Sequence, residues 1–202
     1  LRQTFQLVAP DRPGFGKSDA GRAMTSLREH AARLRPLLER PHHPSKAIVV
    51  GHSLGGPVAA RLAVDYPEKV RGLILVAPSI SPELEKLRWY NRIAAFPLVR
   101  TILPDALRTS NDEIMPLKRE LEILEKRLPE IDVPVIVIQG EKDSLVPPGN
   151  ARFVENAFTS ASVQVWRFRD LNHFIPWTRP DLIRSAIQEI AETPQSNPVP
   201  DT

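Results

Sequence analysis

The chain has 202 residues, 42% of them hydrophobic and 25% charged, which suits one globular domain with a substantial buried core. Its formal net charge of +3, with no dense lysine or arginine run, argues against a nucleic-acid partner. The absence of cysteine excludes disulfides, a thiol nucleophile and cysteine metal ligands.

Five short apolar or β-branched runs predict strands, at Phe5–Ala9, Ala47–Val50, Leu73–Ala77, Val135–Ile138 and Val163–Phe168. The second, third and fourth runs are almost continuously apolar, which is typical of strands buried on both faces of a parallel sheet. Helical patterns alternate with them, at Ser26–Arg40, Gly56–Asp65, Asn150–Ala157 and Asp181–Glu192. This alternation predicts an α/β fold, with a mostly parallel sheet and helices on both faces.

Residues 79–131 break this rhythm with prolines and amphipathic helical patterns, so they are interpreted as a helical insertion lying over the sheet. The core is then formed by residues 1–78 and 132–192, and residues 193–202 are expected to be a disordered tail. No apolar run approaches the roughly 18 residues of a membrane span. The first residues also lack the pattern of a signal peptide, so a cytoplasmic protein is expected.

The strongest chemical signal is the segment AIVVGHSLGG at residues 47–56, where a buried strand runs through Gly-x-Ser-x-Gly into a helix of small residues. On such a sharp turn the hydroxyl of Ser53 would project from the carboxyl edge of the sheet as a nucleophile. The glycines two residues before and after it are expected because neighbouring backbone approaches too closely for side chains. The amide of Leu54, at the start of the helix, is expected to donate to an oxyanion.

This turn and its surroundings resemble the α/β-hydrolase family over nearly the whole chain. The segment FQLVAPDRPGFGKS at 5–18 looks like the family's fourth strand and following turn, and PEKVRGLILVA at 67–77 matches the approach to its sixth strand. The insertion at 79–131 occupies the place of the family's variable cap. The resemblance implies an α/β-hydrolase fold with a helical cap and a serine hydrolase activity.

The resemblance also indicates the other two members of a catalytic triad. The acid should follow the next strand, where VIVIQGEKDS at 135–144 offers Asp143 at the aspartate of a Gly-x-x-Asp pattern and Glu141 as a competitor. The base should lie in the loop after the last strand, where DLNHFIPW at 170–177 offers His173. The order Ser, Asp, His along the chain is that of this fold. His52, beside the nucleophile, is expected to point elsewhere.

Some parts of the family pattern have no counterpart before Leu1, namely the first three strands and the loop that supplies a second oxyanion donor. The third strand of the family lies between the fourth and the fifth. The Phe5–Ala9 strand is therefore expected either to pair directly with Ala47–Val50 or to leave unpaired backbone. A truncated, catalytically weak fragment is one reading of the chain.

We expect a serine hydrolase that acts on carboxylic esters or related acyl bonds of a small molecule through an acyl-serine intermediate. Perhydrolysis and carbon–carbon bond hydrolysis stay as alternatives because the same triad serves them. No metal or cofactor is implied, since no cluster has metal-ligand spacing and GFGKS at 14–18 lacks the first glycine of a P-loop. The residues expected to line the acyl pocket are Trp89, Tyr90, Phe96 and Trp177.

Overall fold

The computed structural model describes residues 4–18, 23–39, 46–86, 96 and 103–194. Within these residues the strands are β1 (Ala47–His52), β2 (Val70–Val76), β3 (Val135–Gly140) and β4 (Val163–Phe168). The helices are α1 (Leu27–Leu38), α2 (Gly55–Asp65), α5 (Asp105–Ile114), α6 (Leu117–Glu125), α7 (Gly149–Ala157), α8 (Ile175–Thr178) and α9 (Pro180–Glu192). Two single 3-10 turns, η1 (Pro67–Lys69) and η2 (Leu128–Glu130), precede β2 and β3.

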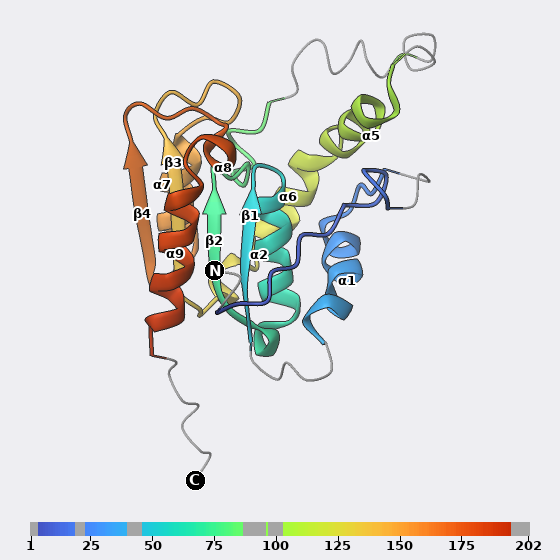
Figure 1. Ribbon diagram of the computed structural model, residues 1–202. Helices are drawn as coiled ribbons and strands as arrows, with labels where there is room; N and C mark the ends of the chain where they lie inside the picture. Colours follow the sequence, from blue (N-terminus) through green and yellow to red (C-terminus); the bar gives the residue numbers. More distant parts are fainter. Residues whose placement is uncertain (1–3, 19–22, 40–45, 87–95, 97–102, 195–202) are drawn as a thin grey trace.

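The described strands form one parallel sheet in the order β1-β2-β3-β4 (Figure 1). Because every strand runs in the same direction, the carboxyl ends of all four meet at one edge of the sheet. The residues that follow β1, β3 and β4 therefore come together there, although they are far apart in the sequence. The α/β class and the parallel sheet predicted from the sequence are confirmed.

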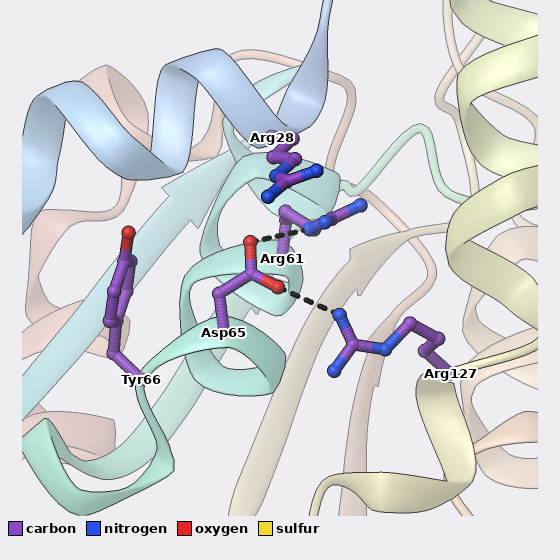
Figure 2. Close-up of a pocket in the computed structure, with 5 residues that line it drawn as sticks. All are labelled: Arg28, Arg61, Asp65, Tyr66 and Arg127. Carbon is purple, nitrogen blue, oxygen red and sulfur yellow. Dashed lines mark hydrogen bonds and ion pairs between the residues drawn. The ribbon is translucent and has the colours of Figure 1, made fainter.

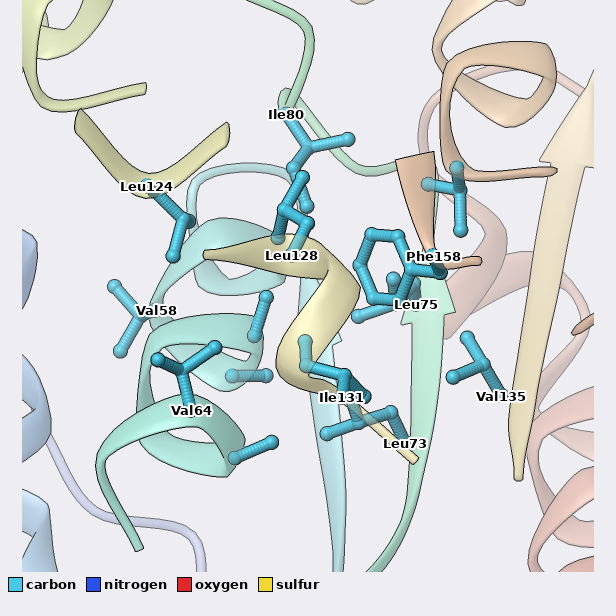
Figure 3. Close-up of a cluster of buried hydrophobic side chains, with 14 of the residues drawn as sticks. Val58, Val64, Leu73, Leu75, Ile80, Leu124, Leu128, Ile131, Val135 and Phe158 are labelled. Carbon is cyan, nitrogen blue, oxygen red and sulfur yellow. The ribbon is translucent and has the colours of Figure 1, made fainter. Parts of the chain in front are cut away.

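Alternate side chains of the central strands enter two separate cores, one on each face of the sheet. Leu73 and Leu75 of β2 pack against α2, α6 and α7, in the cluster of Figure 3. Ile74 and Val76 point the other way, toward α8 and α9. All four are fully buried, and burial of each such side chain contributes about 1.5–3 kcal/mol. Burial on both faces explains why these strands read as continuous apolar runs.

Small residues allow α2 to lie close to the sheet. Ala59, Ala60 and Ala63 are at most 3% exposed, and they belong to the same core as β2 and β3. The close packing holds α2 rigidly behind the turn that joins it to β1.

The strand predicted at Phe5–Ala9 is absent, and this prediction is wrong. Phe5 packs into the core on the α9 side, so the segment crosses the face of the sheet and does not join its edge (Figure 1). Leu7 and Val8 are both largely exposed. The segment has suitable composition, but a strand also needs a neighbour for its backbone hydrogen bonds. In the described part of the chain β1 pairs with β2 alone.

The second half of the described residues between 79 and 131 packs against the rest of the chain. Leu117, Leu121 and Leu124 of α6 are buried in the cluster formed by α2 and the sheet. Further out, Glu113 of α5 is buried and accepts a hydrogen bond from Arg12, 2.6 Å away. Thr193, at the start of the expected tail, accepts a hydrogen bond from Arg71, and residues 195–202 lie outside the described part.

Candidate active site

Ser53 lies on the turn between β1 and α2 in a strained conformation. Its φ of 54° is in the left-handed region, which a residue with a side chain seldom adopts. Its N–H donates to the carbonyl of Val76 at the end of β2, 3.0 Å away. Its carbonyl accepts from Gly56 and Ser79, at 2.9 and 3.2 Å. Three backbone hydrogen bonds, from the start of α2 and from the end of β2 with the residues after it, therefore hold Ser53 in this conformation.

The glycines around Ser53 differ in what they do. A Cβ atom on Gly51 would lie 2.2 Å from the carbonyl oxygen of Gly55, so no larger residue fits there without a backbone shift. A Cβ atom on Gly55 would meet nothing within 4 Å, whereas one on Gly56 would lie 2.6 Å from the Cβ of Pro78. The steric reason expected from the sequence holds for Gly51 and not for Gly55. Gly56 is the second crowded position.

Asp143 and His173 are brought together by the loops after β3 and β4. The Nδ1 nitrogen of His173 donates to Oδ2 of Asp143 over 2.7 Å. The other oxygen, Oδ1, accepts from the amides of Leu145 and Val146 at 2.9 and 2.8 Å. The Asp143 side chain is fully buried and that of His173 is 9% exposed. The bonds to Oδ2 and Oδ1 together fix the carboxylate and, through it, the imidazole.

Glu141, the competing acid, lies elsewhere. Its carboxylate is 3.7 Å from the guanidinium of Arg167, and its side chain is 41% exposed. The pKa of Asp143 lies below its ordinary value. Burial raises it, but the hydrogen bond from His173 and those from Val146 and Leu145 lower it by more. Asp143 is therefore the ionised partner of His173 at neutral pH.

His52 contacts the His173 loop directly, contrary to the sequence expectation. Its Nε2 lies 2.9 Å from the backbone carbonyl oxygen of His173, and because a carbonyl can only accept, Nε2 is the donor. The two imidazole rings are 4.6 Å apart at their centroids. Burial lowers the pKa of His52 by more than the hydrogen bond to the His173 carbonyl raises it. The only sequence signal was that His52 adjoins Ser53 at the end of a strand.

Two exposed aromatic rings, those of Trp177 and Phe174, lie beside this pair. Trp177 of α8 lies edge-on to His52 with a centroid distance of 5.5 Å, and it is 70% exposed. Phe174 lies 5.9 Å from the His173 ring and 6.0 Å from that of Trp177. Phe96 is also exposed. Trp89 and Tyr90, also expected in the pocket, lie outside the described residues.

The remaining geometry concerns Leu54 and the hydroxyl of Ser53. Leu54 has helical angles, φ −55° and ψ −27°, and its amide belongs to the first turn of α2, where N–H groups have no partner within the helix. Between the two described side chains, no hydrogen bond joins the Ser53 hydroxyl to the His173 imidazole.

The described residues hold no group of three or more His, Cys, Asp or Glu side chains placed to bind a metal ion. None of the described helices has the length and apolar character that a membrane crossing needs.

A sequence profile of the α/β hydrolase fold matches residues 1–101. The chain belongs to the α/β hydrolase family. Among solved structures, the fold is similar to a monoacylglycerol lipase of Paleococcus ferrophilus, with a TM-score of 0.67, 21% identity and coverage of 89% of this chain and 80% of that one.

Among the curated proteins similar in sequence to this chain, the matches differ in length. An uncharacterized protein of Mycobacterium tuberculosis is 43% identical over 77 residues, which are 38% of this chain and 22% of that protein. The chain thus spans about a fifth of that relative. A pimeloyl-[acyl-carrier protein] methyl ester esterase of Salmonella enteritidis is 28% identical over 200 residues, covering 82% of this chain and 76% of the esterase.

Proposed function

We propose that this α/β hydrolase is a serine hydrolase that cleaves carboxylic esters or related acyl bonds, with Ser53, His173 and Asp143 as its triad. The observation that carries the proposal is the buried Asp143–His173 hydrogen bond at the sheet edge where the strained turn holds Ser53. A buried carboxylate on Nδ1 leaves Nε2 of His173 as the nitrogen that accepts a proton.

In the proposed reaction His173 takes the proton of the Ser53 hydroxyl while the oxygen attacks the acyl carbon. The tetrahedral oxyanion accepts a hydrogen bond from the Leu54 amide. The carbon–oxygen bond to the alcohol then breaks, and the alcohol leaves with the proton held by His173. Water, deprotonated by His173, attacks the acyl-serine. The bond between the acyl carbon and the Ser53 oxygen then breaks, His173 returns the proton to that oxygen, and the acid is released. The Ser53–His173 hydrogen bond would form with substrate present, as catalytic contacts often do.

His52 would act as a positioning residue. Its bond to the His173 carbonyl ties the base loop to the residue directly before the nucleophile. The aromatic pair Phe174 and Trp177 would contact the apolar part of the substrate. Ester hydrolysis is favoured over carbon–carbon bond hydrolysis and perhydrolysis. The reason is that the sequence match that covers 82% of this chain is to a methyl ester esterase.

A fluorophosphonate probe tests the nucleophile. The wild-type chain should gain the mass of one probe less hydrogen fluoride, measured by intact-mass spectrometry, and lose turnover of a p-nitrophenyl ester in proportion. Ser53→Ala should gain no mass, whereas Ser162→Ala, at an exposed position before β4, should be labelled as wild type. Circular dichroism should show that both variants are folded. Labelling of folded Ser53→Ala at the wild-type rate would refute the proposal.

A further inference from the structure

A cleft of about 410 Å³ lies where α1, α2 and the connection between α6 and η2 meet, and none of the proposed triad residues lines it. Its lining is Arg28, Arg61, Asp65, Tyr66 and Arg127 (Figure 2). Arg28 comes from α1, Arg61 and Asp65 from α2, and Arg127 directly precedes η2. Three segments distant in sequence thus each bring a guanidinium group to one concavity.

The hydrogen bonds of the cleft leave part of this positive charge uncompensated. Asp65 accepts from Nε of Arg61 at 2.7 Å and from Nη1 of Arg127 at 2.8 Å. Arg127 also donates from Nε and Nη2 to Glu130, which lies outside the lining. Each of its three nitrogens therefore already has one carboxylate partner. Each oxygen of Asp65, which is the single carboxylate of the lining, accepts from one of these two arginines (Figure 2).

Arg28 and Arg61 retain free donors. Arg28 is exposed and makes no hydrogen bond or ion pair to another described residue. Figure 2 places its guanidinium beside the guanidinium of Arg61 and the carboxylate of Asp65. Arg61 uses only Nε, and its side chain is 9% exposed. No nitrogen of Arg61 is among the described polar atoms that are buried without a partner, so its Nη groups keep at least a small contact with solvent. The guanidinium of Arg28 and the Nη groups of Arg61 therefore have N–H donors left for a ligand in the cleft.

The charge and the side chains of the cleft suit a phosphate group. Three arginines and one aspartate give the lining a net formal charge of +2, and the neighbouring Glu130, bonded to Arg127, reduces it to +1. Guanidinium forks match the oxygens of phosphate in a bidentate manner, and a phosphate monoester carries close to two negative charges at neutral pH. The lining has no aliphatic side chain, so it does not suit an acyl chain. The volume lies within the roughly 300–1,000 Å³ usual for small-molecule sites.

We propose that this cleft binds the phosphate group of a small soluble phosphate monoester, held chiefly by Arg28 and Arg61 and independently of the hydrolase site. The aromatic ring of Tyr66 forms one wall beside it. The ligand's charge would offset the positive charge that Asp65 and Glu130 leave uncompensated. The carboxylate of Asp65 keeps the two inner guanidiniums oriented when the cleft is empty.

Isothermal titration calorimetry of the full chain with inorganic phosphate, and separately with glycerol 3-phosphate, tests the proposal, with sodium chloride of equal ionic strength as the blank. Arg28→Gln should raise the Kd for inorganic phosphate and for glycerol 3-phosphate roughly tenfold or more, because a charge-assisted hydrogen-bonding partner is lost. The affinity of Arg28→Lys should lie between those of wild type and Arg28→Gln, because lysine keeps the charge and loses the two-pronged guanidinium. Arg33→Gln, an exposed arginine of the same helix outside the cleft, should bind as wild type.

Arg61→Gln should also lose binding, and its unfolding temperature in chloride would show whether the variant is folded. Binding to vesicles with and without phosphatidic acid is measured as well, to distinguish a soluble phosphate from a lipid headgroup. Binding of soluble phosphate that depends on Arg28 and not on Arg33 supports the site. No heat beyond the chloride blank, equal weakening by Arg28→Gln and Arg33→Gln, or binding to acidic vesicles alone would overturn it.

Discussion

The imidazole of His52 donates a hydrogen bond from Nε2 to the backbone carbonyl oxygen of His173, 2.9 Å away, although 121 positions separate the two residues. The bond links the residue before the proposed nucleophile to the proposed base. Any shift of the base loop relative to the Ser53 turn must stretch it. The pair therefore couples the positions of two groups that have to meet at the same substrate atom.

Two His52 variants separate the hydrogen bond from the ring contact. His52→Phe keeps an aromatic ring against His173 and Trp177 but loses the donor, and His52→Gln keeps a donor and loses the ring. Loss of a neutral hydrogen bond corresponds to about 0.5–1.5 kcal/mol. We expect kcat for a small ester to fall roughly three- to tenfold in His52→Phe, with KM little changed, and less in His52→Gln. Steady-state kinetics measures this. A fall in kcat no greater in His52→Phe than in His52→Gln would argue against a positioning role for the hydrogen bond.

Asp143→Asn should reduce turnover on the order of 10⁴-fold, because an amide holds His173 in the wrong tautomer. Glu141→Gln is the matched control, since Glu141 is in the same loop but is 41% exposed and faces Arg167. It should keep nearly all activity. Initial rates on a p-nitrophenyl ester, with folding checked by circular dichroism, compare the two. The reverse result would make Glu141 the acid.

The lowered pKa of His52 predicts a pH-dependent contribution to stability. The unfolded chain binds a proton at His52 near the ordinary pKa of about 6.5, whereas the folded chain resists protonation until lower pH. The contribution of neutral His52 is therefore complete above about pH 6.5 and is lost as the pH falls toward the folded pKa. The unfolding free energy of wild type minus that of His52→Gln should decrease between pH 7.5 and pH 5. Urea unfolding measures it, and a constant or growing difference would contradict the sign.

Gly51 and Gly55 should respond oppositely to a methyl group. Gly51→Ala places a Cβ 2.2 Å from the Gly55 carbonyl and should lower the unfolding free energy by about 1–3 kcal/mol, because packed backbone must move. Gly55→Ala meets no atom within 4 Å at the first position of α2, where alanine favours helix. Its stability should be unchanged or slightly higher. Urea unfolding of both variants tests this, and equal destabilisation would show that the turn is crowded on both sides.

Local patterns in the sequence determined most of the elements and one turn of the site. The runs at Ala47–Val50 and Val163–Phe168 became β1 and β4, and Gly-x-Ser-x-Gly became the turn at Ser53. Such features depend on residues a few positions apart, whose burial period and backbone preferences the chain itself records.

The tertiary structure alone decided what depends on distant partners. Phe5–Ala9 has strand-like composition, yet it crosses the sheet because a strand requires a hydrogen-bonded neighbour as well. The contact of His52 with His173 and the meeting of Arg28, Arg61 and Arg127 at one cleft join segments with no shared local pattern. The physical reason is that a parallel sheet and the packing of its helices set which side chains meet, and no spacing in the sequence encodes that distance.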